Sequence, residues 1–339
     1  MRRGLSTALR TLTGHPSRGP AVTPWLLVAL VVWMSVATAV IPAVAQTTAL
    51  DPQTIYDRTA PAVGVVRVMV DGRTGIGTAF AIDREGLLLT ASHVARRADD
   101  LAVEFPGELR MPARLIGYDA RRDLALLRVS APAPLVAIEV ASDGLRAGEP
   151  VVVIGTPRGR PGVMTVGEIV APRASLPGLA RETLIRINAP IAPGNSGGPV
   201  LNARGQVVGL VIARGNDGAG LAVSSETILA ALPTLRNGAR VERPWIGVSG
   251  RSVTPDLARE RGLGVERGAL ILDLVPDSPA SAADLRPDDI IIALDGAPLV
   301  SWEDLLGVVA EREPGQRVRL TVARGSARLD LQVTLGARP

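Results

Sequence analysis

The residues with the clearest chemical potential stand at positions 193–200, where Ser196 is flanked by three glycines. Serine offers little apolar surface to a core, whereas glycine permits positive φ and the close approach of another chain. An exposed hydroxyl on such a turn, beside converging backbone N–H groups, is what an acyl-transfer nucleophile requires. Gly-Ser clusters also mark ordinary loops, so this stretch alone indicates a nucleophile and a plain hairpin about equally.

A serine nucleophile needs a general base within hydrogen-bonding reach. The chain has two histidines, His15 and His93, and we expect His15 to lie outside the folded region. His93 follows an apolar strand pattern at 87–90, a place where a histidine is more often structural. It belongs to a different series of strands from Ser196, however, and a cleft between two barrels would draw on both. We therefore predict His93 as the base.

The base in turn needs an acid that fixes its orientation. Asp123 opens the apolar strand pattern 124–129, where its carboxylate can be held at a barrel rim and partly desolvated. Asp119 is the nearby competitor, but it precedes a polar turn and is expected to make a local turn bond. We choose Asp123, which gives the chain order His, Asp, Ser, one of several that such triads use.

The composition excludes several other functions. The chain has 339 residues, enough for about two domains, and no cysteine, which rules out disulfides, thiol nucleophiles and cysteine-ligated metals. All 37 basic residues are arginine, the net charge is +4, and no run of five like charges occurs, so nucleic-acid binding is not expected. A two-histidine zinc site would need both His15 and His93. We expect no metal and no cofactor.

The N-terminal segment has the pattern of an export signal. Residues 1–20 carry four arginines and no acid, residues 25–41 are uncharged and mostly apolar, and Ala43-Val44-Ala45 fits a cleavage site. The apolar run is also just long enough to span a bilayer. We expect either a signal peptide cleaved after Ala45, which is slightly favoured, or an uncleaved transmembrane anchor. Both place the remainder outside the cytoplasm.

The following region reads as two series of short strands separated by turn residues. Asp51-Pro52 predicts a helix N-terminus that opens a helix to about residue 60. The first series of expected strands is 63–70, 78–82, 87–90, 101–105, 114–118 and 124–129. The second series is 151–154, 163–170, 184–188, 200–201, 207–213 and 220–223. Two series of about six strands predict a mainly β fold with two small barrels in tandem.

The last hundred residues change character. A helix over 224–232 is expected to stop at Pro233, and residues 233–244 are expected to form an exposed linker. The remainder predicts a small α+β module. Its expected strands are 245–248, 269–275, 289–294, 317–323 and 328–335, and its expected helices are 279–285 and 302–311.

Four segments together resemble the trypsin-like serine proteases of the HtrA (DegP/DegS) family: 75–82, 88–94, 123–129 and 194–200. The C-terminal module resembles the PDZ domain that follows the protease in that family, with residues 245–248 similar to its carboxylate-binding strand. The likeness covers roughly residues 51–339. It implies a trypsin-like double six-stranded β-barrel followed by an α+β PDZ domain.

The resemblance also implies roles for individual residues. His93 is implied as the general base, Asp123 as its orienting acid and Ser196 as the nucleophile. The backbone N–H groups of Gly194 and Ser196 would form the oxyanion hole. Digestive relatives carry an acid before the serine, which pairs with a new N-terminal amine. Asn195 cannot form that ion pair, so the resemblance implies activation by loop ordering, with candidate loops at 171–181, 189–193 and 214–219.

Substrate recognition is expected at two places. The strand 207–213 would line the specificity pocket through Leu210, Val211 and Ile212. These side chains are apolar and predict cleavage after small or medium aliphatic residues. A purely packing role for the three is an equally open alternative. In the PDZ module, residues Ile246, Gly247 and Val248 would present backbone amides to a C-terminal carboxylate while the ligand adds a strand to the sheet.

We thus predict four regions: 1–45 signal or anchor, 46–232 protease, 233–244 linker and 245–339 PDZ domain. The predicted function is an extracytoplasmic serine endopeptidase, in the periplasm or cell-envelope exterior, acting on unfolded or damaged envelope proteins. Expected partners are unfolded polypeptides, C-terminal peptides at the PDZ domain, the membrane if the anchor is uncleaved, and copies of itself in a homotrimer implied by resemblance alone. The alternative is a proteolytically silent PDZ scaffold or chaperone.

Overall fold

The computed structural model describes residues 51–107, 110–174, 184–215 and 217–339. The segment 1–45, predicted as a signal or anchor, lies outside these residues. Within the described ranges, no helix is both long and apolar enough to cross a membrane. The described chain begins at α2 (Pro52–Thr59), whose N-cap Asp51 accepts hydrogen bonds from the backbone N–H groups of Gln53 and Thr54. This confirms the helix start predicted from Asp51-Pro52.

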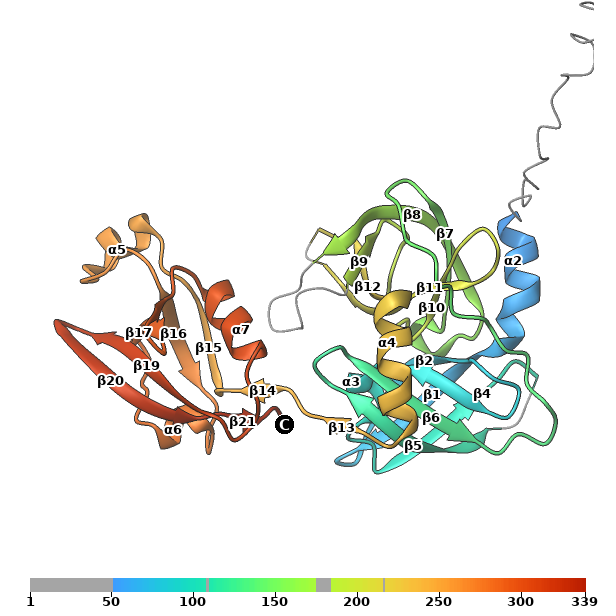
Figure 1. Ribbon diagram of the computed structural model, residues 1–339, viewed down its shortest axis with the longest axis horizontal. Coiled ribbons are helices and arrows are strands. Elements are labelled where there is room, and N and C mark those ends of the chain that lie inside the picture. The colour runs from blue at the N-terminus through green and yellow to red at the C-terminus, as the bar shows by residue number, and fades with distance from the viewer. Residues whose placement is uncertain (1–50, 108–109, 175–183, 216) are drawn as a thin grey trace, which may run out of the picture. The chain divides into compact units, whose positions relative to one another are not determined.

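The first barrel follows the 3₁₀ turn η1 (Ala60–Ala62) (Figure 1). Its strands are β1 (Val63–Val70), β2 (Arg73–Ala81), β3 (Leu87–Thr90), β4 (Asp100–Glu104), β5 (Met111–Asp119) and β6 (Leu124–Val129). They pair in the order β5-β4-β1-β2-β3-β6, and a β5–β6 pairing closes the ring. Strand β2 starts five residues before the predicted strand. The reason is the two-residue turn at Asp71 and Gly72, both with positive φ, which sets Val70 opposite Arg73.

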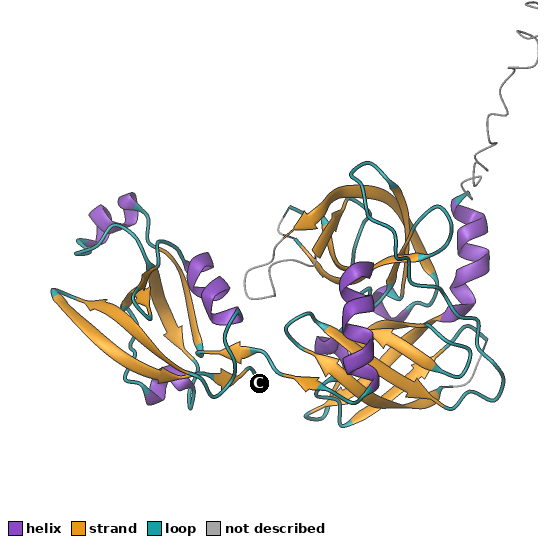
Figure 2. Cartoon of the chain, in the orientation of Figure 1, coloured by secondary structure: helices purple, strands orange, loops and turns teal. Residues whose placement is uncertain are grey.

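The second barrel is also closed, in the order β10-β11-β12-β9-β8-β7. Its strands are β7 (Pro150–Gly155), β8 (Val163–Ala174), β9 (Leu184–Ile187), β10 (Pro199–Leu201), β11 (Val207–Arg214) and β12 (Gly220–Ser224). Two short elements contribute to the cleft described below, α3 (Ser92–Ala95) in the first barrel and η2 (Pro157–Gly159) in the second. Strands dominate both barrels, and helices occur only at their edges (Figure 2). The predicted double barrel is confirmed.

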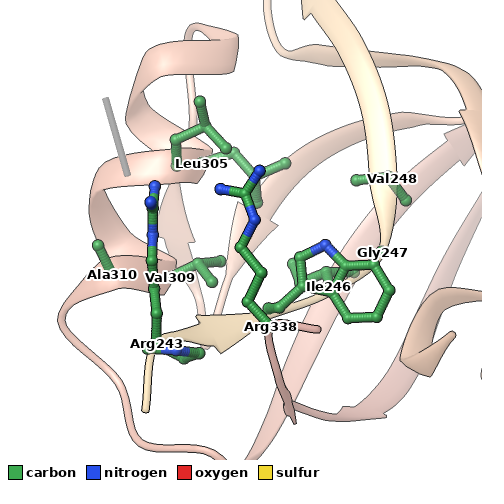
Figure 3. A pocket seen from close by; sticks show the side chains of 11 residues that line it. Arg243, Ile246, Gly247, Val248, Leu305, Val309, Ala310 and Arg338 are labelled. Atoms are coloured by element: carbon green, nitrogen blue, oxygen red, sulfur yellow. The ribbon is translucent and has the colours of Figure 1, made fainter. Parts of the chain in front are cut away.

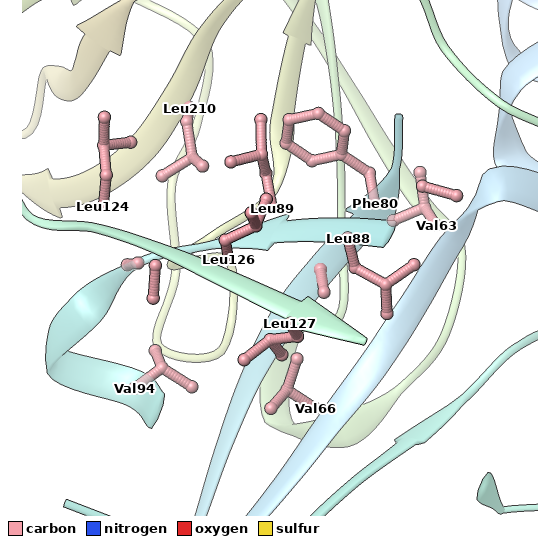
Figure 4. Close-up of a cluster of buried hydrophobic side chains, with 14 of the residues drawn as sticks. Val63, Val66, Phe80, Leu88, Leu89, Val94, Leu124, Leu126, Leu127 and Leu210 are labelled. Carbon is pink, nitrogen blue, oxygen red and sulfur yellow. The ribbon is translucent and has the colours of Figure 1, made fainter. Parts of the chain in front are cut away.

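Aliphatic side chains fill the barrels, as the scarcity of aromatic residues requires. One cluster joins Phe80, Leu89 and Leu126 of the first barrel to Leu210 of the second (Figure 4). A separate cluster inside the second barrel contains Val151, Ile185, Val211 and other buried aliphatic residues. Because the larger cluster takes residues from both barrels, the two are packed as one body, and the loops at their junction are held from both sides.

Helix α4 (Ser225–Arg236) covers this shared core with Ile228, Ala231 and Leu235. We predicted that Pro233 would stop the helix, but the helix continues for another turn beyond Leu232. Packing of its last turn against the barrel outweighs the hydrogen bond that Pro233 cannot donate.

The segment after α4 is not simply an exposed linker. It forms β13 (Arg240–Val241), which pairs in parallel with β5. It then leads to β14 (Pro244–Trp245), in which Pro244 is buried. Backbone hydrogen bonds to β5, which a polar composition does not reveal, order this part of the chain.

The C-terminal module has its own core. Its sheet runs β15 (Val248–Ser252), β16 (Ala269–Leu274), β17 (Ile290–Leu294), β19 (Arg317–Arg324) and β20 (Ala327–Thr334), with β18 (Ala297–Pro298) paired to β17. Helices α5 (Pro255–Arg261), α6 (Pro279–Ala282) and α7 (Trp302–Ala310) and the pair β14–β21 (Gly336–Ala337) complete it. We predicted one strand over 245–248, but Gly247, at φ +94°, interrupts it between β14 and β15.

Candidate active site

His93 is held by the turn that opens strand β6. Its Nδ1 lies 2.7 Å from Oδ2 of Asp123, and its backbone N–H donates to Oδ1 of the same carboxylate at 2.9 Å. Asp123 is buried and has positive φ (+58°), which turns its carboxylate back toward α3. The structure therefore brings these two sequence-predicted residues together. The competitor Asp119 instead accepts hydrogen bonds from its neighbours Arg121 and Arg122, the local turn bonding that we expected.

Ser92 is a further partner of the same carboxylate. Its hydroxyl donates to Oδ1 of Asp123 at 2.9 Å, and the residue is 1 % exposed. Asp123 thus receives three donors, the Ser92 hydroxyl, the His93 backbone and the His93 ring. Burial lowers the pKa of His93, but the hydrogen bond and the negative charge of Asp123 raise it by more, so its pKa stands above the ordinary value. Such an imidazole is a stronger base than a free one.

Ser196 approaches this pair from the second barrel. Its backbone carbonyl accepts from the N–H of Thr78 in β2 at 2.8 Å, which ties the nucleophile loop to the first barrel. Gly197 makes this possible, since at φ +89° a Cβ there would lie 2.0 Å from the Thr78 carbonyl oxygen. The Ser196 hydroxyl lies 3.5 Å from the carbonyl oxygen of Ile212, and Ile212 lines the same pocket as His93 and Asp123. Catalytic hydrogen bonds are often loose before substrate binds.

The peptide bond between Pro193 and Gly194 has a fixed orientation. The Pro193 carbonyl accepts from the backbone N–H of Arg158 at 3.0 Å. The N–H of Gly194 belongs to the same peptide plane and therefore points the opposite way. Within the described residues, neither this N–H nor that of Ser196 has an acceptor. Free N–H groups two residues apart, one of them on the serine itself, are the kind of donors that an oxyanion site requires.

Two buried threonines fix the other side of Gly194. Its carbonyl accepts from the hydroxyls of Thr78 at 2.7 Å and Thr156 at 3.2 Å, and the two hydroxyls lie 2.9 Å apart. Both threonines are 0 % exposed, one from each barrel. Sequence reasoning missed Thr78, Thr156, Arg158 and Ser92, because no local pattern reports a contact between hydroxyls 78 residues apart.

The candidate specificity residues separate into two kinds. Leu210 belongs to the core shared by the barrels, and Val211 belongs to the core inside the second barrel. Ile212 alone of the three lines the pocket beside His93. Ile191 adds a second apolar side chain near the nucleophile loop, in contact with the position of Gly220 in β12.

Asn195 is buried between the nucleophile and Gly155 of β7. It is 3 % exposed, and its Oδ1 has no hydrogen-bond partner within the described residues. Its uncharged side chain makes no ion pair, consistent with its residue type. Of the candidate regulatory loops, residues 175–181 of 171–181 and residue 216 of 214–219 lie outside the described residues.

The second candidate site lies between β14, β15 and α7. Ile246 is buried in the core of the module, its carbonyl accepts from Ala280 at 2.8 Å, and that of Gly247 accepts from Val275 at 2.9 Å. The Gly247 N–H shares a peptide plane with the Ile246 carbonyl, so it points away from α6. It has no acceptor among the described residues. Ile246, Gly247 and Val248 line one pocket with Leu305 and Val309 of α7.

Comparisons with known proteins agree with this geometry. Residues 77–210 match the trypsin-like peptidase domain family, and residues 244–335 match the PDZ domain family. The chain is 36% identical over 270 residues, 78% of its length, to a probable periplasmic serine endoprotease DegP-like of Pseudomonas fulva, and 35% identical over 272 residues, 79% of its length, to that of a Marinomonas species. It spans 56% and 58% of those two relatives.

Solved structures extend the likeness to both domains. An HtrA-type protease AlgW with a tripeptide is 31% identical, with a TM-score of 0.55 over 85% of this chain and 98% of the other. The same protease with a decapeptide is 29% identical, with a TM-score of 0.58 over 86% and 99%. The resemblance seen in the sequence is confirmed. The chain belongs to the HtrA-type family of trypsin-like serine proteases that carry a PDZ domain.

Proposed function

We propose that this protein is a serine endopeptidase that cleaves unfolded or damaged proteins through an acyl-enzyme on Ser196. The observation that carries the proposal is the fixed Pro193–Gly194 peptide, which leaves the N–H groups of Gly194 and Ser196 free beside the His93–Asp123 pair. An oxyanion site and an oriented base at one serine serve acyl transfer and have no role in a plain loop.

The reaction begins when the Ser196 hydroxyl turns from the Ile212 carbonyl toward Nε2 of His93. The oxygen attacks the scissile carbonyl carbon while the proton passes to Nε2, and the carbonyl becomes an oxyanion held by Gly194 and Ser196 N–H. Collapse breaks the C–N bond, and His93 returns the proton to the leaving amine. Water then repeats the sequence and releases the acyl group. Asp123 keeps the imidazole in the tautomer that accepts the proton and stabilises its charge.

We further propose that the cleft prefers a small or medium aliphatic side chain before the scissile bond. Ile212 supplies an apolar wall beside His93. Leu210 and Val211 support this only indirectly, by packing behind β11. Cleavage-site mapping on a denatured protein tests the preference, and predominant cleavage after arginine or acidic residues would contradict it.

We place the protein outside the cytoplasm, with residues 1–45 as its signal or anchor. Relatives bearing the name periplasmic serine endoprotease support the compartment.

We propose that C-terminal peptides bind at Ile246, Gly247 and Val248 and regulate the protease. This regulation would replace activation by zymogen cleavage, because the neutral Asn195 cannot pair with a new N-terminal amine. Solved relatives with tripeptide and decapeptide support peptide binding. A homotrimer is proposed by family likeness, and light scattering of the purified protein tests it.

Hydrolysis of casein tests the enzyme. Ser196→Ala and His93→Ala should each abolish cleavage, whereas Ser142→Ala, at an exposed serine in the same domain, should leave it unchanged. Cleavage by Ser196→Ala at the wild-type rate would overturn the proposal.

The rival function is a proteolytically silent scaffold. The observation that favours it is the Ser196 hydroxyl, which lies at a long 3.5 Å from the carbonyl oxygen of Ile212. Peptide binding without any hydrolysis, with and without C-terminal peptides, would select the scaffold.

A further inference from the structure

Two arginines stand at one end of the PDZ pocket. Arg243 immediately precedes β14, Arg338 immediately follows β21, and the pairing of these strands brings them together. The backbone N–H of Arg338 donates to the Arg243 carbonyl at 2.8 Å. Both residues line the pocket, and both side chains extend from this end toward α7 (Figure 3).

Neither guanidinium has a hydrogen-bond or ion-pair partner within the described residues. The contrast in the same module is Arg324, which contacts both Asp284 and Asp289. Arg243 is half-buried, and burial, followed by the charge of Arg338, lowers its pKa to about 10. Both arginines also line the pocket that holds His93 and Asp123, and the Asp123 carboxylate attracts Arg243 without forming an ion pair with it. The two cations still repel each other, so an anion that enters between them gains from both.

The rest of the pocket is apolar and ends in a free N–H group. Ile246, Leu305 and Val309 form its apolar lining, and the N–H of Gly247 points away from α6 without an acceptor. A C-terminal carboxylate would accept a hydrogen bond from this N–H group, and an apolar last side chain would pack against the lining. The two arginines remain, and they line the same pocket at its β14 end, within reach of the side chain of a preceding ligand residue.

We propose that this groove selects C-terminal peptides that carry an acidic side chain at the second-to-last or third-to-last residue, and that Arg243 and Arg338 bind this second carboxylate. The inference rests on the proposed peptide binding and names the class of peptide. Arginine favours this role because its planar guanidinium donates two parallel hydrogen bonds to a carboxylate. The selectivity comes from charge, since an isosteric amide fits the same space.

Fluorescence anisotropy on the full chain carrying Ser196→Ala, which prevents cleavage, tests the proposal. The probes are labelled decapeptides ending in Val, with one Asp or one Asn at the second-to-last or third-to-last position, and an amidated form of each. The best Asp peptide should bind about tenfold tighter than its Asn partner, and the difference should shrink as salt rises. Equal affinity of Asp and Asn peptides at both positions would overturn the inference.

Substitutions assign the effect to the two arginines. Arg243→Gln and Arg338→Gln should each remove most of the Asp preference while keeping affinity for the Asn peptides within about threefold. Arg328→Gln, at an exposed arginine of β20, is the matched control and should change nothing. Arg338→Glu should reverse the preference toward a peptide with Lys in place of Asp. An Asp preference that survives in both glutamine variants would contradict the assignment.

The outcomes separate this inference from the function on which it rests. If Asp and Asn peptides bind equally and amidation abolishes both, peptide capture by the PDZ domain stands and the acidic selectivity is wrong. If no peptide binds, the PDZ part of the proposed function fails, and the selectivity fails with it. Wild-type circular dichroism and melting of each variant exclude misfolding as the cause.

Discussion

The molecule contains two sites built from the same backbone device, and they differ in what surrounds them. At Gly194 (φ +102°) and at Gly247 (φ +94°), a left-handed glycine presents an N–H group that has no acceptor among the described residues. At Gly194 the surroundings are uncharged donors, the hydroxyls of Thr78 and Thr156. At Gly247 the surroundings include two cations, Arg243 and Arg338, which also reach the pocket beside His93 and Asp123.

This difference matches two kinds of anion. A tetrahedral intermediate carries its charge only briefly, so the first site needs rigid dipoles that are in place before the charge forms. A peptide C-terminus is charged throughout, so the second site can use full charges that also attract the ligand from a distance. We therefore expect catalysis at the first site to depend mainly on its rigidity, and peptide affinity at the second site to depend mainly on its charge.

Asp123→Asn should lower kcat of casein or peptide hydrolysis by about 10⁴, because the amide favours the wrong imidazole tautomer. The measurement is steady-state kinetics on a chromogenic peptide. Asp119→Asn is the matched control and should lose far less, since Asp119 bonds only to its own turn. Similar losses in the two variants would show that the first site does not depend on a single orienting carboxylate.

Thr78→Val and Thr156→Val should each lower kcat roughly ten- to hundredfold with little change in KM. Each removes a hydroxyl that holds the Gly194 carbonyl, and the oxyanion site acts mainly in the transition state. Thr78→Ser should restore most of the rate. Thr59→Val removes a buried hydroxyl that bonds Ile55, far from the cleft, and serves as the control. Equal effects on kcat in all three valine variants would refute a positioning role.

Gly247→Ala should weaken binding of C-terminal peptides by more than about tenfold in the Ser196→Ala background. The φ of +94° is unfavourable for alanine, and its Cβ would meet Ser278 Cβ at 2.2 Å. Gly264→Ala, where a Cβ would meet nothing closer than 3.6 Å, is the control. Unchanged affinity in Gly247→Ala would show that the second site does not rely on this turn.

The pH dependence of hydrolysis sharpens the account of the first site. Because Asp123 raises the pKa of His93 above its ordinary value, kcat/KM should fall as the pH drops through that raised pKa, where the imidazole already holds a proton. Ser92→Ala removes one donor from Asp123, leaves more of its negative charge to the imidazolium of His93 and should move the profile further alkaline. A loss of about threefold near pH 6 is expected from one hydrogen bond. A shift in the acidic direction would contradict this reading.

The sequence allowed the strands and the principal side chains to be predicted for identifiable reasons. Alternating apolar runs and turn residues located the twelve barrel strands, and the scarcity of histidine left His93 as the one base in the folded region. Asp123 could be preferred to Asp119 because one opens a buried strand and the other a polar turn.

The remaining features depend on contacts between distant segments. The orientation of the Pro193 carbonyl depends on an N–H from η2, and the joining of Arg243 to Arg338 depends on the β14–β21 pairing. Helix α4 passes through Pro233 because tertiary packing outweighs local propensity. None of these has a signature within a short stretch of sequence, so none could be derived from periodicity or composition.

The central claim is that Ser196 is a nucleophile activated at a preformed oxyanion site. Its most direct test is labelling of the full chain with a fluorophosphonate, followed by intact-mass measurement and peptide mapping. The account predicts one phosphonyl group per chain, attached to Ser196, at a rate that falls when His93 becomes protonated. No label under any condition, or a label on another serine while Ser196 stays free, would contradict the account.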